Sequence, residues 1–191
     1  MTIQILDALE RRLRDPGLLD YVGALGTSLV QKNIITGPWA PNSALTQRVK
    51  GGNLPLRDSA KPGLVNSMTH TVRNDTAVIG TNHPAAVILH NGGTITPKTS
   101  RYLAIPLGAE TRRFMHTYGA TPRKCLDAMA ADGYKVWVAK GCILVQKGKT
   151  GRVRALFVLK KSAKIPARQF MRLPEASVRI IETAVRRRVF G

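Results

Sequence analysis

The stretch that decides the fold is residues 155–173, which read ALFVLKKSAKIPARQFMRL. Its apolar beginning, residues 155–159, is rich in Leu, Phe and Val, which is typical of a strand with at least one buried face. The stretch then becomes basic at Lys160, Lys161 and Lys164, and Pro166 prevents a helix or an inner strand from continuing. After Pro166 the apolar spacing becomes helical. We therefore predict a strand, a basic turn and a helix.

Further strands are expected on the N-terminal side of this stretch. Alternating apolar residues interrupted by glycine-rich turns predict a run of three strands, 134–139, 142–146 and 153–159. Residues 69–73 and 77–80 alternate around Asn74-Asp75, a pattern that indicates a β-hairpin. Residues 102–107 are a further strand, which Pro106 places near an edge or an end of its sheet.

Helical patterns frame these strands at both ends of the chain. Apolar spacing predicts one helix over 3–13, capped by Thr2 and ended by Asp15-Pro16-Gly17, and a second helix over 18–34. Between the strands we expect a short helix or turn at 64–68, a helical turn that ends at the glycines after His90-Asn91, and a helix at 122–131. The last helix opens at Pro174, and its apolar stripe is Val178, Ile181, Val185 and Val189.

Residues 35–66 interrupt every periodic pattern, because they contain four prolines and the pair Gly51-Gly52. Such a long irregular segment is uncommon inside a compact domain unless it has a function. We interpret it as an arm, with a helical turn at 43–50, that is ordered by contact with other subunits. A disordered surface loop is the alternative.

The predicted fold class is therefore α+β: a mostly antiparallel sheet flanked by N-terminal and C-terminal helices, with a long irregular arm. At 191 residues the chain is long enough for one well-cored domain, 1–191. Within it we expect a helical N-terminal segment (1–34), the arm (35–66), a sheet core (67–173) with an insertion at about 110–139, and the C-terminal helix (174–191).

The chain is strongly basic, with 30 Lys and Arg against 11 Asp and Glu and a net charge of +19. The excess is concentrated in residues 110–191, which hold 19 of the bases and 5 of the acids. This asymmetry indicates a polyanionic partner, either nucleic acid or an acidic protein subunit. A solvated basic face is the other interpretation of any single Lys or Arg.

Other function classes have little support. Two cysteines provide no disulfide framework and no cysteine-rich metal site, and they favour a reducing compartment. No apolar run reaches the length of a membrane span, and residues 1–13 lack the character of a signal peptide. The four histidines show no metal-binding spacing, and Gly148-Lys149-Thr150 lacks the glycine spacing of a phosphate-binding loop. We expect no enzyme, no cofactor and no metal site.

Several separated pieces of the chain resemble one protein family. The first pieces are Trp39-Ala40-Pro41, Thr46 and Lys50, Pro55-Leu56-Arg57-Asp58, and Leu64 with Ser67. The next are Val78-Ile79-Gly80, Pro84-Ala85-Ala86 with His90-Asn91-Gly92-Gly93, and Tyr102 to Leu107. The last are Phe157-Val158-Leu159-Lys160-Lys161 and Ile165-Pro166-Ala167-Arg168-Gln169-Phe170. Their order and spacing are similar to those of the virion morphogenesis proteins of tailed bacteriophages.

The resemblance implies a non-enzymatic structural virion protein, a tail completion or tail terminator protein that joins tail to head at the neck. Such proteins assemble as closed rings, commonly hexamers, and contact other neck proteins and the tail tube. The implied location is the virion, assembled in the host cytoplasm, with double-stranded DNA in the channel as a further partner and no membrane. An arm and exposed sheet edges suit contacts around a ring, and a basic half suits DNA or an acidic neighbour.

Two groups of residues are the candidate contacts. The predicted contacts with DNA or an acidic partner are Lys160, Lys161, Lys164, Arg168, Arg172, Arg186, Arg187 and Arg188. Eight phosphate contacts would give a salt slope of roughly seven. Alternatively, Arg186, Arg187 and Arg188 complement the dipole of the last helix, and Arg168 pairs with a carboxylate of its own or a neighbouring subunit.

The second group lies in the arm. The predicted subunit interface consists of Trp39, Pro41, Leu54 and Leu56. Trp39 is either the anchor of the arm in a neighbouring subunit or a buried staple of its own subunit. Phe170 is expected to anchor the corner after Pro166 in the core. The alternative function for the whole chain is non-specific binding of double-stranded DNA.

Overall fold

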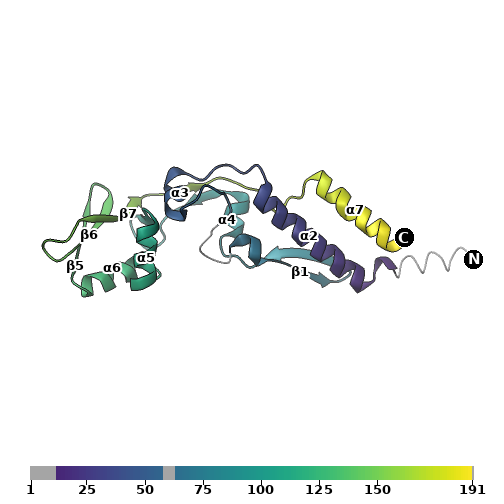
Figure 1. The fold of residues 1–191 in the computed structure, drawn as a ribbon, viewed down its shortest axis with the longest axis horizontal. Coiled ribbons are helices and arrows are strands. Elements are labelled where there is room, and N and C mark those ends of the chain that lie inside the picture. The colour runs from purple at the N-terminus through teal and green to yellow at the C-terminus, as the bar shows by residue number, and fades with distance from the viewer. Residues whose placement is uncertain (1–11, 58–62, 191) are drawn as a thin grey trace, which may run out of the picture. The chain divides into compact units, whose positions relative to one another are not determined.

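The structure is a computed structural model, in which residues 12–57 and 63–190 are described (Figure 1). The chain divides into two compact units. Unit 1 contains the described parts of Met1–Trp39, Leu56–Asn91 and Ala167–Gly191, and unit 2 contains Ala40–Pro55 and Gly92–Pro166. Each unit has its own cluster of buried apolar side chains. The predicted helix over 3–13 lies almost entirely outside the described residues.

Two helices dominate unit 1 and pack against each other, α2 (Pro16–Thr36) and α7 (Glu175–Phe190) (Figure 1). The Asp15 carboxylate accepts a hydrogen bond from the backbone N–H of Gly17, and Pro16 occupies the first turn, where its missing N–H costs nothing. From the sequence we expected Asp15-Pro16-Gly17 to end the first helix. In the structure these residues begin α2. The predicted second helix and C-terminal helix are both confirmed.

A β-hairpin packs on α2. Its strands, β1 (Met68–Arg73) and β2 (Thr76–Thr81), pair antiparallel from Met68 opposite Thr81 to Arg73 opposite Thr76. Asn74 and Asp75 form the turn with φ values of 46° and 55°, the left-handed conformation that a two-residue hairpin loop requires. The sequence predicted this hairpin and its turn.

Close approach of the hairpin to α2 depends on two buried glycines of the helix, Gly23 and Gly26. A Cβ atom at Gly23 would overlap the stem of the His70 ring, including its Cγ atom. A Cβ atom at Gly26 would overlap Cδ1, the far end of the Ile79 side chain, and would lie at ordinary contact distance from Cγ1 of the same residue. The two positions therefore differ in how easily their neighbours can move.

The core of unit 1 is closed by short elements. A 3-10 turn, η1 (Leu64–Ser67), leads into β1, and α4 (Ala86–Asn91) follows β2 and ends at Gly92, whose φ is 70°. Both were predicted. The buried side chains that form this core are Val30, Ile34, Leu56, Leu64, Met68, Ala86 and Phe170.

Unit 2 contains a four-stranded antiparallel sheet of order β4-β7-β6-β5. Its strands are β4 (Leu103–Pro106), β5 (Tyr134–Ala139), β6 (Cys142–Lys147) and β7 (Arg154–Lys160). All four were predicted, and β4 is an edge strand, as Pro106 indicated. The helices α5 (Ala109–Tyr118) and α6 (Pro122–Ala131) pack against each other, and α6 also packs on β5. The helix α5 was not predicted.

The core of unit 2 lies between these helices and the sheet. Its buried side chains are Cys125, Met129, Ile143, Val145, Leu156 and Phe157. Thr111 is 2% exposed, and its hydroxyl donates to the carbonyl oxygen of Leu156 at 2.8 Å. The predicted insertion at about 110–139 thus contributes α5, α6 and β5 to the same core as the rest of the sheet.

The remaining elements of unit 2 are short. The strand β3 (Gly93–Ile95) pairs antiparallel with β8 (Ala163–Ile165), and α3 (Ala44–Lys50) packs on α5. The Ser43 hydroxyl caps α3 by accepting from the N–H of Thr46, so the predicted helical turn at 43–50 is confirmed. The helix predicted directly after Pro166 is wrong, because α7 begins only at Glu175 and residues 166–169 are irregular.

Candidate interaction surfaces

The segment after Pro166 forms a corner that is docked on the end of α4. The backbone N–H of Arg168 donates to the carbonyl oxygens of Leu89 and His90, at 3.1 Å in each case. The side chain of Arg168 is only 5% exposed, and burial lowers the pKa of its guanidinium group. The prediction that Arg168 contacts DNA is therefore wrong, because a phosphate on the surface does not reach a buried guanidinium group.

Phe170 fixes this corner, as predicted. It is 1% exposed, and its ring lies edge-on to that of His90 with 5.1 Å between the ring centroids. The side-chain amide of Asn33 on α2 donates to the carbonyl oxygens of Phe170 and Arg172, at 3.0 and 3.1 Å. Backbone hydrogen bonds and a buried ring thus hold this segment in place without helical structure.

The other seven predicted basic contacts are exposed, but they belong to both units. Lys160 ends β7, Lys161 follows it and Lys164 lies in β8, so these three belong to unit 2. The arginines, Arg172 in the corner and Arg186, Arg187 and Arg188 on α7, belong to unit 1. The structure therefore provides two basic surfaces, one on each unit. With Arg168 excluded, seven phosphate contacts would give a salt slope of roughly six.

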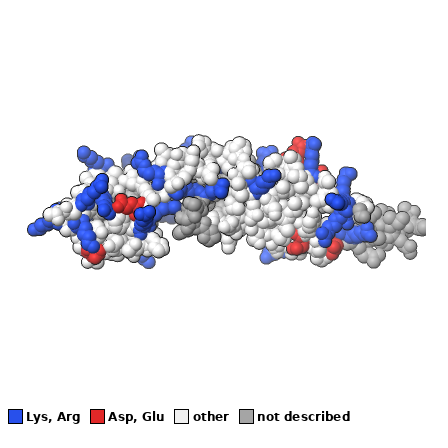
Figure 2. Space-filling model, in the orientation of Figure 1, with Lys and Arg blue, Asp and Glu red and all other residues white. Residues whose placement is uncertain are grey.

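The C-terminal end of α7 carries three consecutive arginines, Arg186, Arg187 and Arg188. Lys and Arg side chains gather over this end of the helix in Figure 2. The Arg188 guanidinium lies over the Tyr21 ring, 4.9 Å from its centroid, and Arg12 donates to the carbonyl oxygen of Val189 at 2.9 Å. Arg187 and Arg188 occupy the last turn, where cations favour the helix dipole. Dipole complementation and partner contact are compatible here, because the side chains remain exposed.

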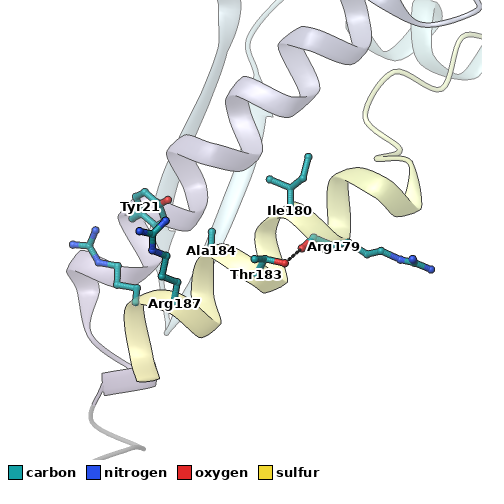
Figure 3. A pocket seen from close by; sticks show the side chains of 7 residues that line it. Tyr21, Arg179, Ile180, Thr183, Ala184 and Arg187 are labelled. Atoms are coloured by element: carbon teal, nitrogen blue, oxygen red, sulfur yellow. Dashed lines mark hydrogen bonds between the residues drawn. The ribbon is translucent and has the colours of Figure 1, made fainter. Parts of the chain in front are cut away.

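A groove of about 680 Å³ lies between α2 and α7. The described residues that line it are Tyr21, Arg179, Ile180, Thr183, Ala184, Arg187 and Arg188. In Figure 3, Tyr21 on α2 borders the same gap as Ile180 and Ala184 on α7. Sequence reasoning missed this groove. The signal in the sequence that could have indicated it was Ile180, an apolar residue beside the predicted apolar stripe of α7. In the structure Ile180 is 46% exposed.

The four predicted interface residues of the arm are also divided between the units. Leu54 is 53% exposed and Pro41 is exposed, both in unit 2. Leu56, at 6% exposed, is part of the unit 1 core, so its prediction as an interface residue is wrong for this conformation. Its left-handed backbone, with a φ of 58°, directs the chain into that core.

Trp39 packs against the core of its own unit. Its ring is half-buried, and its Nε1–H donates to the carbonyl oxygens of Asn33 and Ile34, at 3.1 Å each. Both carbonyls belong to the last turn of α2; that of Asn33 also accepts from the backbone N–H of Gly37 at 2.8 Å. Of the two interpretations of Trp39, the buried staple is the one that this geometry supports.

A polar cluster joins α5, α6 and the sheet of unit 2. The Tyr118 hydroxyl donates to Oδ2 of Asp132 at 2.7 Å, and Nζ of Lys147 lies 3.2 Å from the same oxygen. These contacts lower the pKa of Asp132, chiefly through the Tyr118 hydrogen bond, and the same bond raises the pKa of Tyr118. The cluster stabilises an ionised carboxylate on the surface.

Among residues 12–57 and 63–190, no group of three or more His, Cys, Asp or Glu side chains is arranged to hold a metal ion. No helix in the same described ranges is long and apolar enough to cross a membrane. No known protein family, curated protein or solved structure matches the chain.

Proposed function

We propose that this protein is a structural virion protein of a tailed bacteriophage, a ring-forming subunit that completes the tail and joins it to the head at the neck. The observation that carries the proposal is the position of the pieces that resemble virion morphogenesis proteins. Trp39, Leu56, Leu64, Ala86 and Phe170 come from five separate pieces of the sequence, and all of them pack in or against the core of unit 1. Part of the resemblance is thus gathered in one packed unit, while other pieces, such as Tyr102 to Leu107 and Phe157 to Lys161, belong to unit 2.

The distribution of charge supports the same role. A neck ring encloses or borders DNA and contacts neighbouring proteins, so exposed cations on its subunits attract phosphates or acidic surfaces. Seven of the eight predicted basic contacts are exposed. In the sheet of unit 2, β4 and β5 are edge strands, and such edges can pair with neighbouring subunits.

The mass of the assembled protein tests this proposal. The purified full-length chain is measured by native mass spectrometry and sedimentation, alone and after mixing with purified tail tubes of its phage. We expect a discrete closed ring, with a hexamer as the favoured stoichiometry, either alone or bound to the tube end. A chain that remains monomeric in both conditions, and that does not bind tail tubes, contradicts the proposal.

Non-specific binding of double-stranded DNA is the second candidate, and the net charge of +19 favours it. A free DNA-binding protein would remain monomeric in solution and bind duplex DNA of any sequence. Its affinity would fall steeply with salt, with a slope of up to roughly six if all seven exposed cations contact phosphates. A discrete ring in the absence of DNA, with a shallow salt slope, would argue for the joining protein instead.

A further inference from the structure

The groove between α2 and α7 combines apolar groups with arginines. Ile180 is 46% exposed and Tyr21 is 38% exposed, and Ala184 lies beside them in the gap shown in Figure 3. A volume of about 680 Å³ is within the range of cavities that hold several side chains or a small ligand. Exposed apolar groups of this kind gain free energy when an apolar side chain covers them.

The arginines give the groove a single sign of charge. Arg179, Arg187 and Arg188 line it, and no carboxylate is among its described lining residues. Arg179 is paired with Glu175, with 2.5 Å between Nη2 and Oε1, and its side chain extends away from Tyr21 in Figure 3. Arg188 is held over the Tyr21 ring. The cationic side of the groove is therefore formed mainly by Arg187 and Arg188, next to the apolar surface.

We propose that this groove binds an acidic segment of a different protein, with one apolar or aromatic side chain of that segment inserted between α2 and α7. Charge complementarity carries the choice of occupant: arginines prefer carboxylates, with which they form paired hydrogen bonds, and the apolar surface requires an apolar side chain between those carboxylates. The inference rests on the proposed joining role, because it names the chemistry of one neighbour that the ring would contact.

Two other occupants fit less well. Duplex DNA presents phosphates along its outer surface, which would satisfy the arginines but would leave Ile180 and Tyr21 without an apolar contact. A second copy of this chain carries the same excess of positive charge, +19, so its surface repels an arginine-lined groove. An acidic protein segment satisfies both the charge and the apolar surface.

The test uses three short fluorescein-labelled peptides and the full-length chain, with fluorescence anisotropy as the measurement. The first peptide has Glu and Asp residues around one Phe, the second has Ser in place of Phe, and the third has Lys in place of the acidic residues. We expect the first peptide to bind and the third not to bind. The second should bind at least roughly tenfold more weakly than the first, because burial of one aromatic side chain contributes that much free energy.

Substitutions on α7 test whether the peptide binds in the groove. Ile180→Ser should weaken binding of the first peptide roughly tenfold, and Arg187→Gln roughly fivefold. The matched control is Arg186→Gln, which removes the same charge from the neighbouring position on α7, outside the groove. We expect the control to change the affinity by less than about twofold. Far-UV circular dichroism checks that each variant keeps its helices.

Three results would overturn the inference. The Ser peptide could bind as tightly as the Phe peptide, which would leave charge alone. Arg186→Gln could weaken binding as much as Arg187→Gln, which would place the contact elsewhere on the helix. A labelled DNA duplex could displace the Phe peptide and lose affinity equally in Ile180→Ser, which would assign the groove to nucleic acid.

These results are separable from a failure of the proposed function. A protein that forms rings on tail tubes but does not bind the Phe peptide contradicts only the groove assignment. A protein that binds the peptide in the groove but stays monomeric, with no binding to tail tubes, contradicts the joining role.

Discussion

Replacement of Trp39 with Ala should destabilise unit 1. The ring packs against the core of its own unit, and its Nε1–H donates to two carbonyl oxygens at the end of α2. Full burial of an aromatic side chain makes its replacement by Ala cost 3–5 kcal/mol, and the half-buried ring of Trp39 should cost about 2–3 kcal/mol. Loss of the Nε1–H donor adds about 1 kcal/mol. We expect the free energy of unfolding to fall by about 3–4 kcal/mol, a large part of the stability of a typical domain.

Urea unfolding of the full-length chain measures this change. Far-UV circular dichroism follows the helices, including α2 and α7 of unit 1. In Trp39→Ala the remaining tryptophan is Trp137, in β5 of unit 2, so its fluorescence reports unit 2 in the same sample. The matched variant Trp39→Phe keeps an aromatic ring but loses the donor, and it should cost about 1 kcal/mol.

One result would refute this reasoning. If Trp39→Ala loses less than about 1 kcal/mol of stability but no longer assembles, the ring contributes little to its own unit. Trp39 would then be the anchor of the arm in a neighbouring subunit, the alternative that the sequence left open. If the stability falls as expected, a loss of assembly in the same variant would follow from the destabilised unit and would not identify an interface.

Three smaller predictions concern single positions. Gly23→Ala should lower the free energy of unfolding by about 1–3 kcal/mol, because the His70 ring must move. Gly26→Ala should be neutral or raise the free energy of unfolding by up to about 1 kcal/mol through helix propensity. The urea midpoints of the two variants compare them directly. The lowered pKa of Asp132 contributes stability above the unfolded pKa of about 3.9, and this contribution is lost as the pH falls through the folded pKa. Asp132→Asn should therefore make the stability curve flatter at acidic pH, and an unchanged curve would contradict the role of the cluster. Thr111→Val should cost about 1 kcal/mol in thermal or urea unfolding, since it removes one buried hydrogen bond while the carbonyl acceptor keeps a second donor, the N–H of Leu107.

The secondary structure followed closely from local patterns. The hairpin at Asn74-Asp75 was predictable because few residue pairs adopt left-handed backbone in succession, and the turn then fixes which residues of its strands face each other. The strands β5, β6 and β7 were predictable because apolar alternation and glycine turns occur together. The helix α5 was missed because its sequence, AETRRFMHTY, is mostly polar and few of its side chains are buried.

The candidate surfaces were predictable only in part. Composition and order along the chain indicated where the basic residues are concentrated, and that prediction needs no fold. The burial of Arg168 and Leu56 did not follow from the sequence, because each depends on a segment distant in the chain: the end of α4 for Arg168, and the unit 1 core for Leu56. The groove was hidden for the same reason, since Tyr21 and Ile180 meet only when α2 and α7 pack together.

The sequence by itself determined the α+β class, most element positions and the excess of positive charge, because each of these depends on neighbouring residues or on simple totals. Only the tertiary structure decided that the chain forms two compact units, that one predicted contact arginine is buried, and that an arginine-lined groove lies between two helices. Burial and grooves arise from contacts between segments far apart in the chain, and no local pattern specifies which distant segment will cover a given side chain.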